Sequence, residues 1–161
     1  MERLSEIDLK ILKRLQIEGD IRNVQLAELV PLSPSPCLQR VRKPRKRGFI
    51  AGVSVIVNLG KVAPHVIVHC SIRLSEQTIQ QFRVFVVAIH KIPEIVECSL
   101  ISGNYGYLLK LAVRDMQDFL EILNRMMEMN FGIKNHTSNV EVRSVKRSLA
   151  MPLRSLLKDL A

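Results

Sequence analysis

The chain has 161 residues, of which 47% are hydrophobic, and its formal net charge at pH 7 is +9. This length suits one domain or two small ones, and the positive charge indicates a polyanionic partner. The sequence has no run of 18 apolar residues, no apolar stretch near its start and no CxxC pair among its three cysteines. We therefore expect no membrane span, no signal peptide and no disulfide framework, and a reduced, cytoplasmic location.

The positive charge is concentrated near the N-terminus. Residues 1–50 carry 11 Lys and Arg against 6 Asp and Glu, whereas residues 51–145 carry 9 against 8 and residues 146–161 carry 4 against 1. Six of the eight residues from Arg40 to Arg47 are basic. A run of basic residues is most often solvated surface, so the secondary structure that carries it decides whether it can form a binding surface.

The first predicted helix begins after Ser5. Ser5 is a suitable N-cap residue, and Asp8 three positions later completes a capping box. Apolar residues then follow at helical spacing, namely Ile7, Ile11, Leu12 and Leu15. Gly19 suits the exit, where a left-handed residue is favoured.

Two shorter helices follow. We expect the second to run from Asn23, as its N-cap, through Leu29, because Pro31 cannot extend it. The third has Ser33 as N-cap and Pro34 at its first position, where no amide hydrogen is required. Its wheel places Pro34, Cys37, Leu38 and Val41 on one side and Ser35, Gln39, Arg42, Lys43 and Lys46 on the other.

Three short helices followed by an extended run over Phe49–Leu59 predict a winged helix-turn-helix, whose third helix enters the DNA major groove. Its basic residues would neutralise phosphates, while Gln39 and the arginines can reach base edges. The predicted DNA-binding residues are Asn23, Ser33, Ser35, Gln39, Arg40, Arg42, Lys43, Arg45, Lys46 and Arg47.

Pro44 lies where the third helix would otherwise continue. A proline inside a helix removes one hydrogen bond and clashes with the preceding turn, which costs about 3 kcal/mol. We therefore expect this helix to stop or kink near Lys43–Pro44, and the residues from Arg45 to Arg47 to form a basic loop near the phosphates.

The remainder alternates between strand and helix patterns. We expect strands at His65–Leu74, Ile95–Ile101, Tyr107–Val113 and Lys134–Val142. We expect two helices. The first is capped by Ser75, and its inward residues are Ile79, Phe82, Val86 and Ile89. The second spans Asp115 to Met129, and the apolar residues on one side of it are Met116, Phe119, Leu120, Leu123 and Met127. The order βαββαβ predicts a ferredoxin-like domain, and hence an α+β fold, with self-association through the sheet face that the helices leave open.

Several stretches together resemble the Lrp/AsnC (feast/famine) transcription regulators. They are "IDLKILKRLQIEG", "LSPSPCLQRVRK" leading to "GFI", "PEIVECSLISGNYGYLLK" and "GIKNHTSNVEV". The resemblance implies a winged helix-turn-helix joined by a strand to a ferredoxin-like domain that dimerises, with dimers commonly assembled into octamers. It also implies binding to pseudo-palindromic duplex DNA and, in many members, a response to amino acids bound between dimers.

The resemblance also indicates an effector site. Gly103, Asn104, Tyr105 and Tyr107 match the family's hairpin beside the effector pocket, although both tyrosines equally suit strand packing. His136 and Ser138 stand where the family usually has two threonines near the ligand.

Gly106 stands where the family usually has an aspartate that holds the ligand's ammonium group. A missing charge-assisted hydrogen bond weakens binding by roughly 1.5–3 kcal/mol, or more than tenfold. We therefore expect poor binding of common amino acids, or a different ligand.

These observations predict a helix-turn-helix domain over 1–50, a linker strand over 51–61, an effector-binding and oligomerisation domain over 62–145 and a tail over 146–161 with a short helix. The leading function is sequence-specific DNA-binding transcription regulation, with duplex DNA and a second copy of the chain as partners. The alternatives are an architectural DNA-binding protein without ligand response and a metabolic sensor module without DNA binding. We expect no catalytic residues, no cofactor and no metal.

Overall fold

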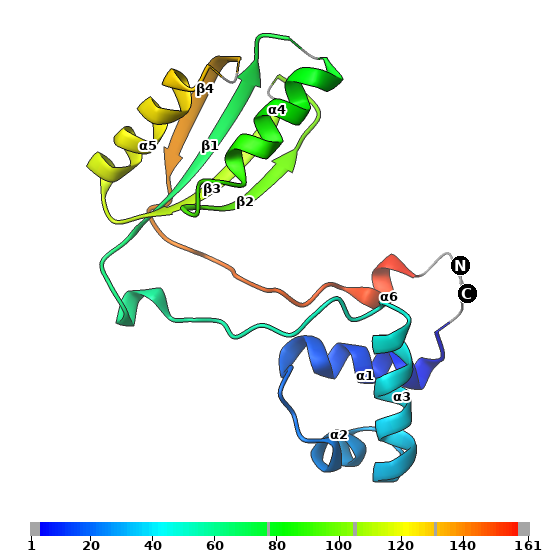
Figure 1. Cartoon of the computed structure of the whole chain (residues 1–161). Helices are drawn as coiled ribbons and strands as arrows, with labels where there is room; N and C mark the ends of the chain where they lie inside the picture. Colours follow the sequence, from blue (N-terminus) through cyan, green and yellow to red (C-terminus); the bar gives the residue numbers. More distant parts are fainter. Residues whose placement is uncertain (1–3, 77, 105, 131, 158–161) are drawn as a thin grey trace. The chain divides into compact units, whose positions relative to one another are not determined.

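The computed structural model describes residues 4–76, 78–104, 106–130 and 132–157. The chain forms two compact units: Met1–Ile56 together with Val145–Ala161, and Val57–Ser144. The backbone therefore leaves the first unit, builds the second and returns to the first (Figure 1).

The first unit contains three helices near its N-terminus, α1 (Glu6–Ile17), α2 (Asn23–Leu29) and α3 (Pro34–Lys46). The predicted capping box of α1 is confirmed, because Ser5 Oγ accepts from the Asp8 amide and an Asp8 carboxylate oxygen accepts from the Ser5 amide, at 3.2 and 3.1 Å. The three helices enclose a small core, whose buried members are Ile11, Leu26, Ala27, Val30 and Cys37.

Two predicted helix ends are wrong. Asn23 is the first helical residue of α2, with Arg22 as N-cap, and its side-chain amide donates to the Pro34 carbonyl at 2.7 Å, joining α2 to the start of α3. Gly19 does not take a left-handed conformation, since the left-handed glycines are Gly48, Gly103 and Gly132. A Cβ on Gly19 would instead lie 2.9 Å from a methyl carbon of Val53, so the missing side chain leaves room for the chain that follows α3.

The predicted end of α3 near Pro44 is also wrong, because the helix continues to Lys46. Pro44 is buried on the inner side of α3. Packing of its ring therefore offsets the loss of the backbone hydrogen bond that a proline cannot make. The next turn closes normally, since the Arg47 amide donates to the Lys43 carbonyl at 3.1 Å. Arg45 and Lys46 are therefore helical, and no basic loop forms at these two residues.

Gly48 ends α3. Its φ is +77°, its amide donates to the Arg45 carbonyl at 3.2 Å, and the Phe49 amide donates to the Pro44 carbonyl at 3.0 Å. This pair of bonds around a left-handed residue is a Schellman motif. It satisfies carbonyls of the last turn, so the turn that carries Arg45 and Lys46 is held by backbone bonds.

The strand that the sequence predicts over 51–61 is not formed. Residues 51–58 have no regular secondary structure, and Leu59–Lys61 form a 3-10 turn, η1. A strand requires a neighbouring strand to accept its amide hydrogens, and in the described part of the chain the sheet contains only strands from residue 66 onward.

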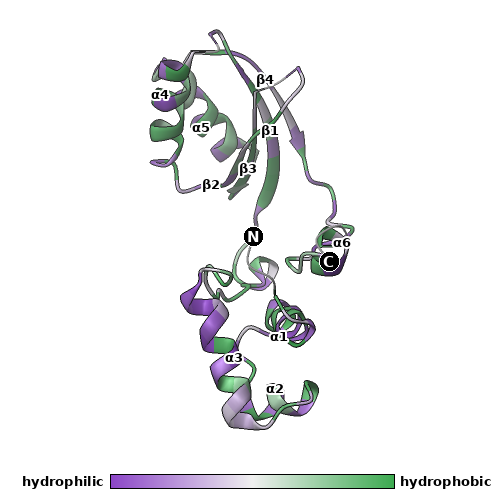
Figure 2. Ribbon diagram, turned by 90° about the vertical axis from the view of Figure 1, so that its right-hand side faces the viewer, coloured by the Kyte–Doolittle hydropathy of each residue, from purple (hydrophilic) through white to green (hydrophobic). Residues whose placement is uncertain are grey.

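The second unit has the predicted βαββαβ order. It consists of β1 (Val66–Leu74), α4 (Ile79–Ile89), β2 (Ile95–Leu100), β3 (Tyr107–Val113), α5 (Met116–Glu128) and β4 (Ile133–Val140). The four strands lie in the order β2-β3-β1-β4, and every neighbouring pair is antiparallel. Both helices cover the same face of the sheet (Figure 2). The ferredoxin-like α+β fold is confirmed.

The core of this unit lies between the sheet and the two helices. Alternate residues of β1 and β3 face it, from Val68 to Leu74 and from Tyr107 to Val113. The inward side of α4 is partly as predicted and is rotated toward Phe85, which is fully buried. Ile89 is buried and Phe82 and Val86 pack against the core as predicted, whereas Ile79 is 72% exposed. Thr78, not Ser75, caps this helix.

The inward side of α5 is also rotated from the predicted one. Phe119 and Leu123 are buried as predicted, but Ile122 and Met126 accompany them. Met116, Leu120 and Met127 are 40–47% exposed. The apolar residues of α5 form one wide stripe, and their spacing alone does not show which part of this stripe lies on the sheet.

Candidate DNA-binding and effector sites

The outer face of α3 is polar and basic. At 100° per residue, the exposed residues Ser35, Gln39, Arg42 and Lys46 fall within about 60° of one another on the helix. The buried Cys37 and Pro44 lie on the opposite side. The helix therefore presents hydrogen-bonding and cationic groups outward along its whole length and is held by its apolar back.

Other predicted DNA-binding residues flank this face. Lys43, Arg45 and Arg47 are exposed, and Ser33 is exposed as the N-cap. The Ser33 hydroxyl makes no capping hydrogen bond to α3. These groups extend the polar surface to both ends of the helix.

Arg40 is directed away from this face. Its guanidinium donates to Ser5 Oγ and to Asp8 Oδ1, both at 3.0 Å, and so joins α3 to the start of α1. Burial raises the pKa of Asp8, but hydrogen bonds from Ser5 and Arg40 and the charge of Arg40 outweigh it, so the pKa lies below its ordinary value. Arg40, like Asn23, contacts other parts of the unit and does not share the outer face of α3.

The second candidate site lies around the β2–β3 hairpin. Gly103 has a φ of +111°, the Ile101 amide donates to the Gly106 carbonyl at 2.9 Å, and the Gly106 amide donates to the Ile72 carbonyl at 3.0 Å. Asn104 is exposed, and Tyr105 lies outside the described residues. The hairpin is thus bound to β1 at Gly106, where the family usually has its aspartate.

The structure shows what Tyr107 contacts. Its side chain is 4% exposed, its ring centroid lies 4.6 Å from that of Phe85, and it meets Phe82 edge to face at 6.1 Å. Burial raises the pKa of its hydroxyl, and the charge of Cys98 raises it further. Tyr107 is therefore part of the helix-covered core, and its partner Phe85 was not among the residues predicted to face inward.

His136 and Ser138 lie on the edge strand β4 and are exposed. His136 pairs with Ile72, which pairs on its other side with Tyr107, so His136 is two strands, or roughly 10 Å, from Tyr107. The Ser138 hydroxyl donates to the Cys70 sulfur at 3.5 Å, and burial raises the pKa of the Cys70 thiol. The hairpin end at Gly106 and the β4 residues thus lie on either side of β1.

Within the described ranges, no group of three or more His, Cys, Asp or Glu residues is arranged to hold a metal ion. No helix in the same ranges is both long and apolar enough to cross a membrane.

The fold and the outer face of α3 define a class: helix-turn-helix DNA-binding proteins that carry a separate ferredoxin-like domain. Comparison with known proteins identifies the family. The AsnC-type helix-turn-helix domain matches residues 4–43, and the Lrp/AsnC ligand binding domain matches residues 67–151. The chain therefore belongs to the Lrp/AsnC family; it is a DNA-binding transcription regulator and not an enzyme.

Individual relatives agree with this assignment. The leucine-responsive regulatory protein of Escherichia coli K12 is 37% identical over 145 residues, which cover 90% of this chain and 88% of that protein. An AsnC family transcriptional regulator from Agrobacterium tumefaciens has a TM-score of 0.89 at 29% identity, covering 96% of this chain and 100% of the other. The transcriptional regulator NMB0573 from Neisseria meningitidis, solved in complex with L-Met, has a TM-score of 0.90 at 27% identity with the same coverage.

Proposed function

We propose that the chain regulates transcription by laying the outer face of α3 in the major groove of duplex DNA. The observation that supports this proposal is the exposed face of α3, on which Ser35, Gln39, Arg42 and Lys46 lie opposite the buried side of the helix. Gln39 and Arg42 would read base edges, while Lys43, Arg45, Lys46 and Arg47 would contact phosphates. Asn23 and Arg40 would act indirectly, because they hold α3 against α2 and α1.

The proposal includes assembly into dimers and larger oligomers, with an octamer as the expected form. The sheet face that α4 and α5 leave open carries partly buried apolar residues such as Ile67, Leu108 and Ala112. A sheet covered on one face only is stabilised when a second layer covers the other. A dimer would place two α3 helices in successive major grooves about 34–36 Å apart. Such a protein would act in the cytoplasm, where its DNA is.

Two variants test DNA recognition. Lys43→Ala should weaken binding to specific and non-specific duplexes alike and lower the slope of log affinity against log salt by about 0.9, the share of one phosphate contact. Gln39→Ala should preferentially reduce the ratio of specific to non-specific affinity. Titrations at matched salt measure both quantities. Equal affinity of all three proteins for DNA would contradict the proposed placement of α3.

We further propose that the effector is an amino acid or related metabolite, bound around the hairpin and β4 with a reduced affinity. The proposed contacts are Gly103, Asn104, Tyr105, Gly106, His136 and Ser138, while Tyr107, which is buried against Phe85, would support the hairpin from the core. The L-Met complex of the Neisseria meningitidis relative supports this class of ligand. Gly106 supports the reduced affinity, because no side chain is present there to hold an ammonium group. The same residue favours the second candidate function, an architectural DNA-binding protein without ligand response.

Gly106→Asp separates these two functions. A Cβ at Gly106 would have only ordinary contact, 3.9 Å from the Ile72 carbonyl oxygen, so the aspartate fits the backbone. One charge-assisted hydrogen bond of roughly 1.5–3 kcal/mol should tighten amino-acid binding about ten- to a hundredfold. Calorimetry with L-leucine and L-methionine measures this, with Gly60→Asp as a charge-matched control in the same unit.

The possible outcomes of this experiment distinguish the two candidate functions. Tighter binding by Gly106→Asp alone supports a weakened effector site. Absence of binding in both variants, together with DNA affinity that no amino acid changes, supports the architectural function. Micromolar binding by the unmodified chain, equal to that of Gly106→Asp, would contradict the role given to Gly106.

A further inference from the structure

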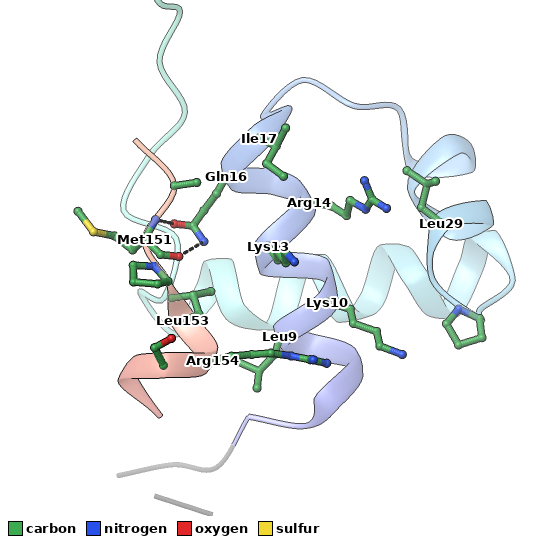
Figure 3. Close-up of a pocket in the computed structure, with 14 residues that line it drawn as sticks. Leu9, Lys10, Lys13, Arg14, Gln16, Ile17, Leu29, Met151, Leu153 and Arg154 are labelled. Atoms are coloured by element: carbon green, nitrogen blue, oxygen red, sulfur yellow. Dashed lines mark hydrogen bonds between the residues drawn. The ribbon is translucent and has the colours of Figure 1, made fainter. Parts of the chain in front are cut away.

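A groove of about 760 Å³ lies in the first unit, on a side of α1 that the DNA-binding proposal does not use. Its walls are α1, the turn between α2 and α3, and the returning C-terminal segment (Figure 3). We call it the α1 groove. Its size is in the range of ligand sites in proteins, but it is open to solvent along α1.

The C-terminal segment forms one wall through specific contacts. The Gln16 side-chain amide accepts from the Met151 amide at 2.6 Å and donates to the Met151 carbonyl at 3.3 Å. Arg154 pairs with Glu6 at 3.2 Å, and the short helix α6 (Leu153–Leu156) lies against α1. The tail helix predicted from the sequence therefore docks on α1 of its own chain.

The α1 groove is cationic. Lys10, Lys13 and Arg14 line it at the i, i+3 and i+4 positions of α1, and all three are exposed. No acidic side chain lines it, and none of the three cations has an ion-pair partner within the described residues. The cations are spread over about 6 Å of helix axis, which suits successive carboxylates better than one compact anion.

The same groove exposes large apolar side chains. Ile17 is 66% exposed, Leu29 is 48% exposed and Met151 is 62% exposed, and all three belong to its lining. Apolar groups next to unpaired cations favour a ligand that supplies both carboxylates and apolar anchors. Phosphates of a nucleic acid would gain nothing from these three side chains.

The α1 groove is separated from the recognition face by α1 itself. In Figure 3, α3 crosses behind α1, while the labelled groove residues lie to either side of α1, with Met151 and Leu153 on the returning segment and Leu29 on α2. Ile11, on the other side of α1, packs in the core with Cys37 of α3. A ligand in the groove therefore does not need the surface that α3 offers to DNA.

We propose that the α1 groove is a docking surface for an acidic amphipathic segment of a partner protein. Its carboxylates would pair with Lys10, Lys13 and Arg14, and its apolar side chains would cover Ile17, Leu29 and Met151. Charge complementarity selects this occupant, because the described lining offers cations and apolar groups without a single carboxylate. The inference goes beyond DNA binding and effector response.

The probe is a fluorescein-labelled synthetic peptide with leucines at i, i+3, i+4 and i+7 and glutamates between them. Its anisotropy is measured with the full-length chain, free and bound to DNA. Lys10→Glu/Lys13→Glu should weaken peptide binding roughly tenfold or more, because two attractions become repulsions. The control Lys61→Glu/Lys91→Glu makes the same change of charge at exposed residues of the second unit. Ile17→Ser tests the apolar contact without a change of charge, and Lys10→Gln/Lys13→Gln replaces the reversal if it impairs folding.

The proposal requires that the peptide binds the chain both free and bound to DNA. It also requires that the groove variants bind the peptide more weakly and that the control variant binds it as the unmodified chain does. A peptide in which serines replace the leucines should bind at least tenfold more weakly. Equal binding of the serine peptide would overturn the proposal, since charge alone would then explain the affinity. Unchanged binding to Lys10→Glu/Lys13→Glu would overturn it too. So would a loss of DNA affinity beyond that of the control, since the groove would then belong to the DNA interface.

Discussion

Arg40→Ala should destabilise the helix-turn-helix unit while leaving the electrostatics of DNA binding unchanged. The Arg40 guanidinium donates at 3.0 Å to both Ser5 and Asp8, and the Arg40 side chain is 39% exposed. An ion pair of this exposure contributes roughly 0.2–1 kcal/mol, and the capping box of Ser5 and Asp8 survives the substitution. We therefore expect the free energy of unfolding in urea to fall by about 1 kcal/mol or less.

The pH dependence of this loss follows from Asp8. Its pKa in the folded chain lies below the ordinary 3.8, since the bonds from Ser5 and Arg40 outweigh burial. A lowered carboxyl pKa stabilises the folded state above the ordinary value, and this stabilisation is lost as the pH falls through the folded value. The difference in unfolding free energy between the unmodified chain and Arg40→Ala should stay constant from neutral pH to about pH 4 and shrink below it.

DNA titrations at several salt concentrations complete the test. Arg40→Ala should leave the slope of log affinity against log salt unchanged, whereas Lys43→Ala should lower it by about 0.9. If Arg40→Ala lowers the slope as much as Lys43→Ala does, and leaves the unfolding free energy unchanged, then Arg40 contacts a phosphate and the inward placement is refuted.

Two further predictions concern the ends of this unit. Gly48→Ala should reduce the free energy of unfolding by about 1–2 kcal/mol, because φ is +77° there and no neighbour lies within 4 Å of a Cβ, so only backbone strain is added. Gly52→Ala, equally open but without the left-handed φ, should change it little; equal losses in urea unfolding would disprove the Schellman role of Gly48. Gln16→Ala should speed hydrogen exchange at the Met151 amide by removing its acceptor at 2.6 Å. Gln117→Ala on α5 is the matched control, and unchanged exchange in Gln16→Ala would show that the tail does not depend on Gln16.

Features that depend on neighbours along the chain could be predicted from the sequence. The capping box needs only Ser5 and Asp8 at the right spacing, and the βαββαβ order needs only the change between period 2 and period 3.6 in the apolar residues. The outer face of α3 was also predictable, since a helical wheel separates Gln39, Arg42 and Lys46 from Cys37. In each case the cause lies within a few residues.

Features that depend on distant partners could not be predicted in this way. Arg40 is one of six basic residues in its run, and only the acceptors on α1, 32 and 35 residues away in the chain, distinguish it from the others. Pro44 violates helix propensity, yet burial of its ring keeps it in the helix. The inward side of α5 likewise depends on which part of its wide apolar stripe meets the sheet, and the spacing of the residues does not show this.

The errors at Arg40 and Pro44 have a common physical origin in the small core of the first unit. A small core cluster, Ile11, Leu26, Ala27, Val30 and Cys37, holds its three N-terminal helices together, so apolar burial alone leaves the orientation of α3 weakly fixed. Polar contacts along α3 supply the rest: Asn23 attaches its start to α2, Arg40 attaches its middle to α1, and Gly48 closes its last turn. Because marginal stability makes each contribution of about 1 kcal/mol significant, these residues should affect DNA binding through the position of α3 even though none of them lies on its outer face.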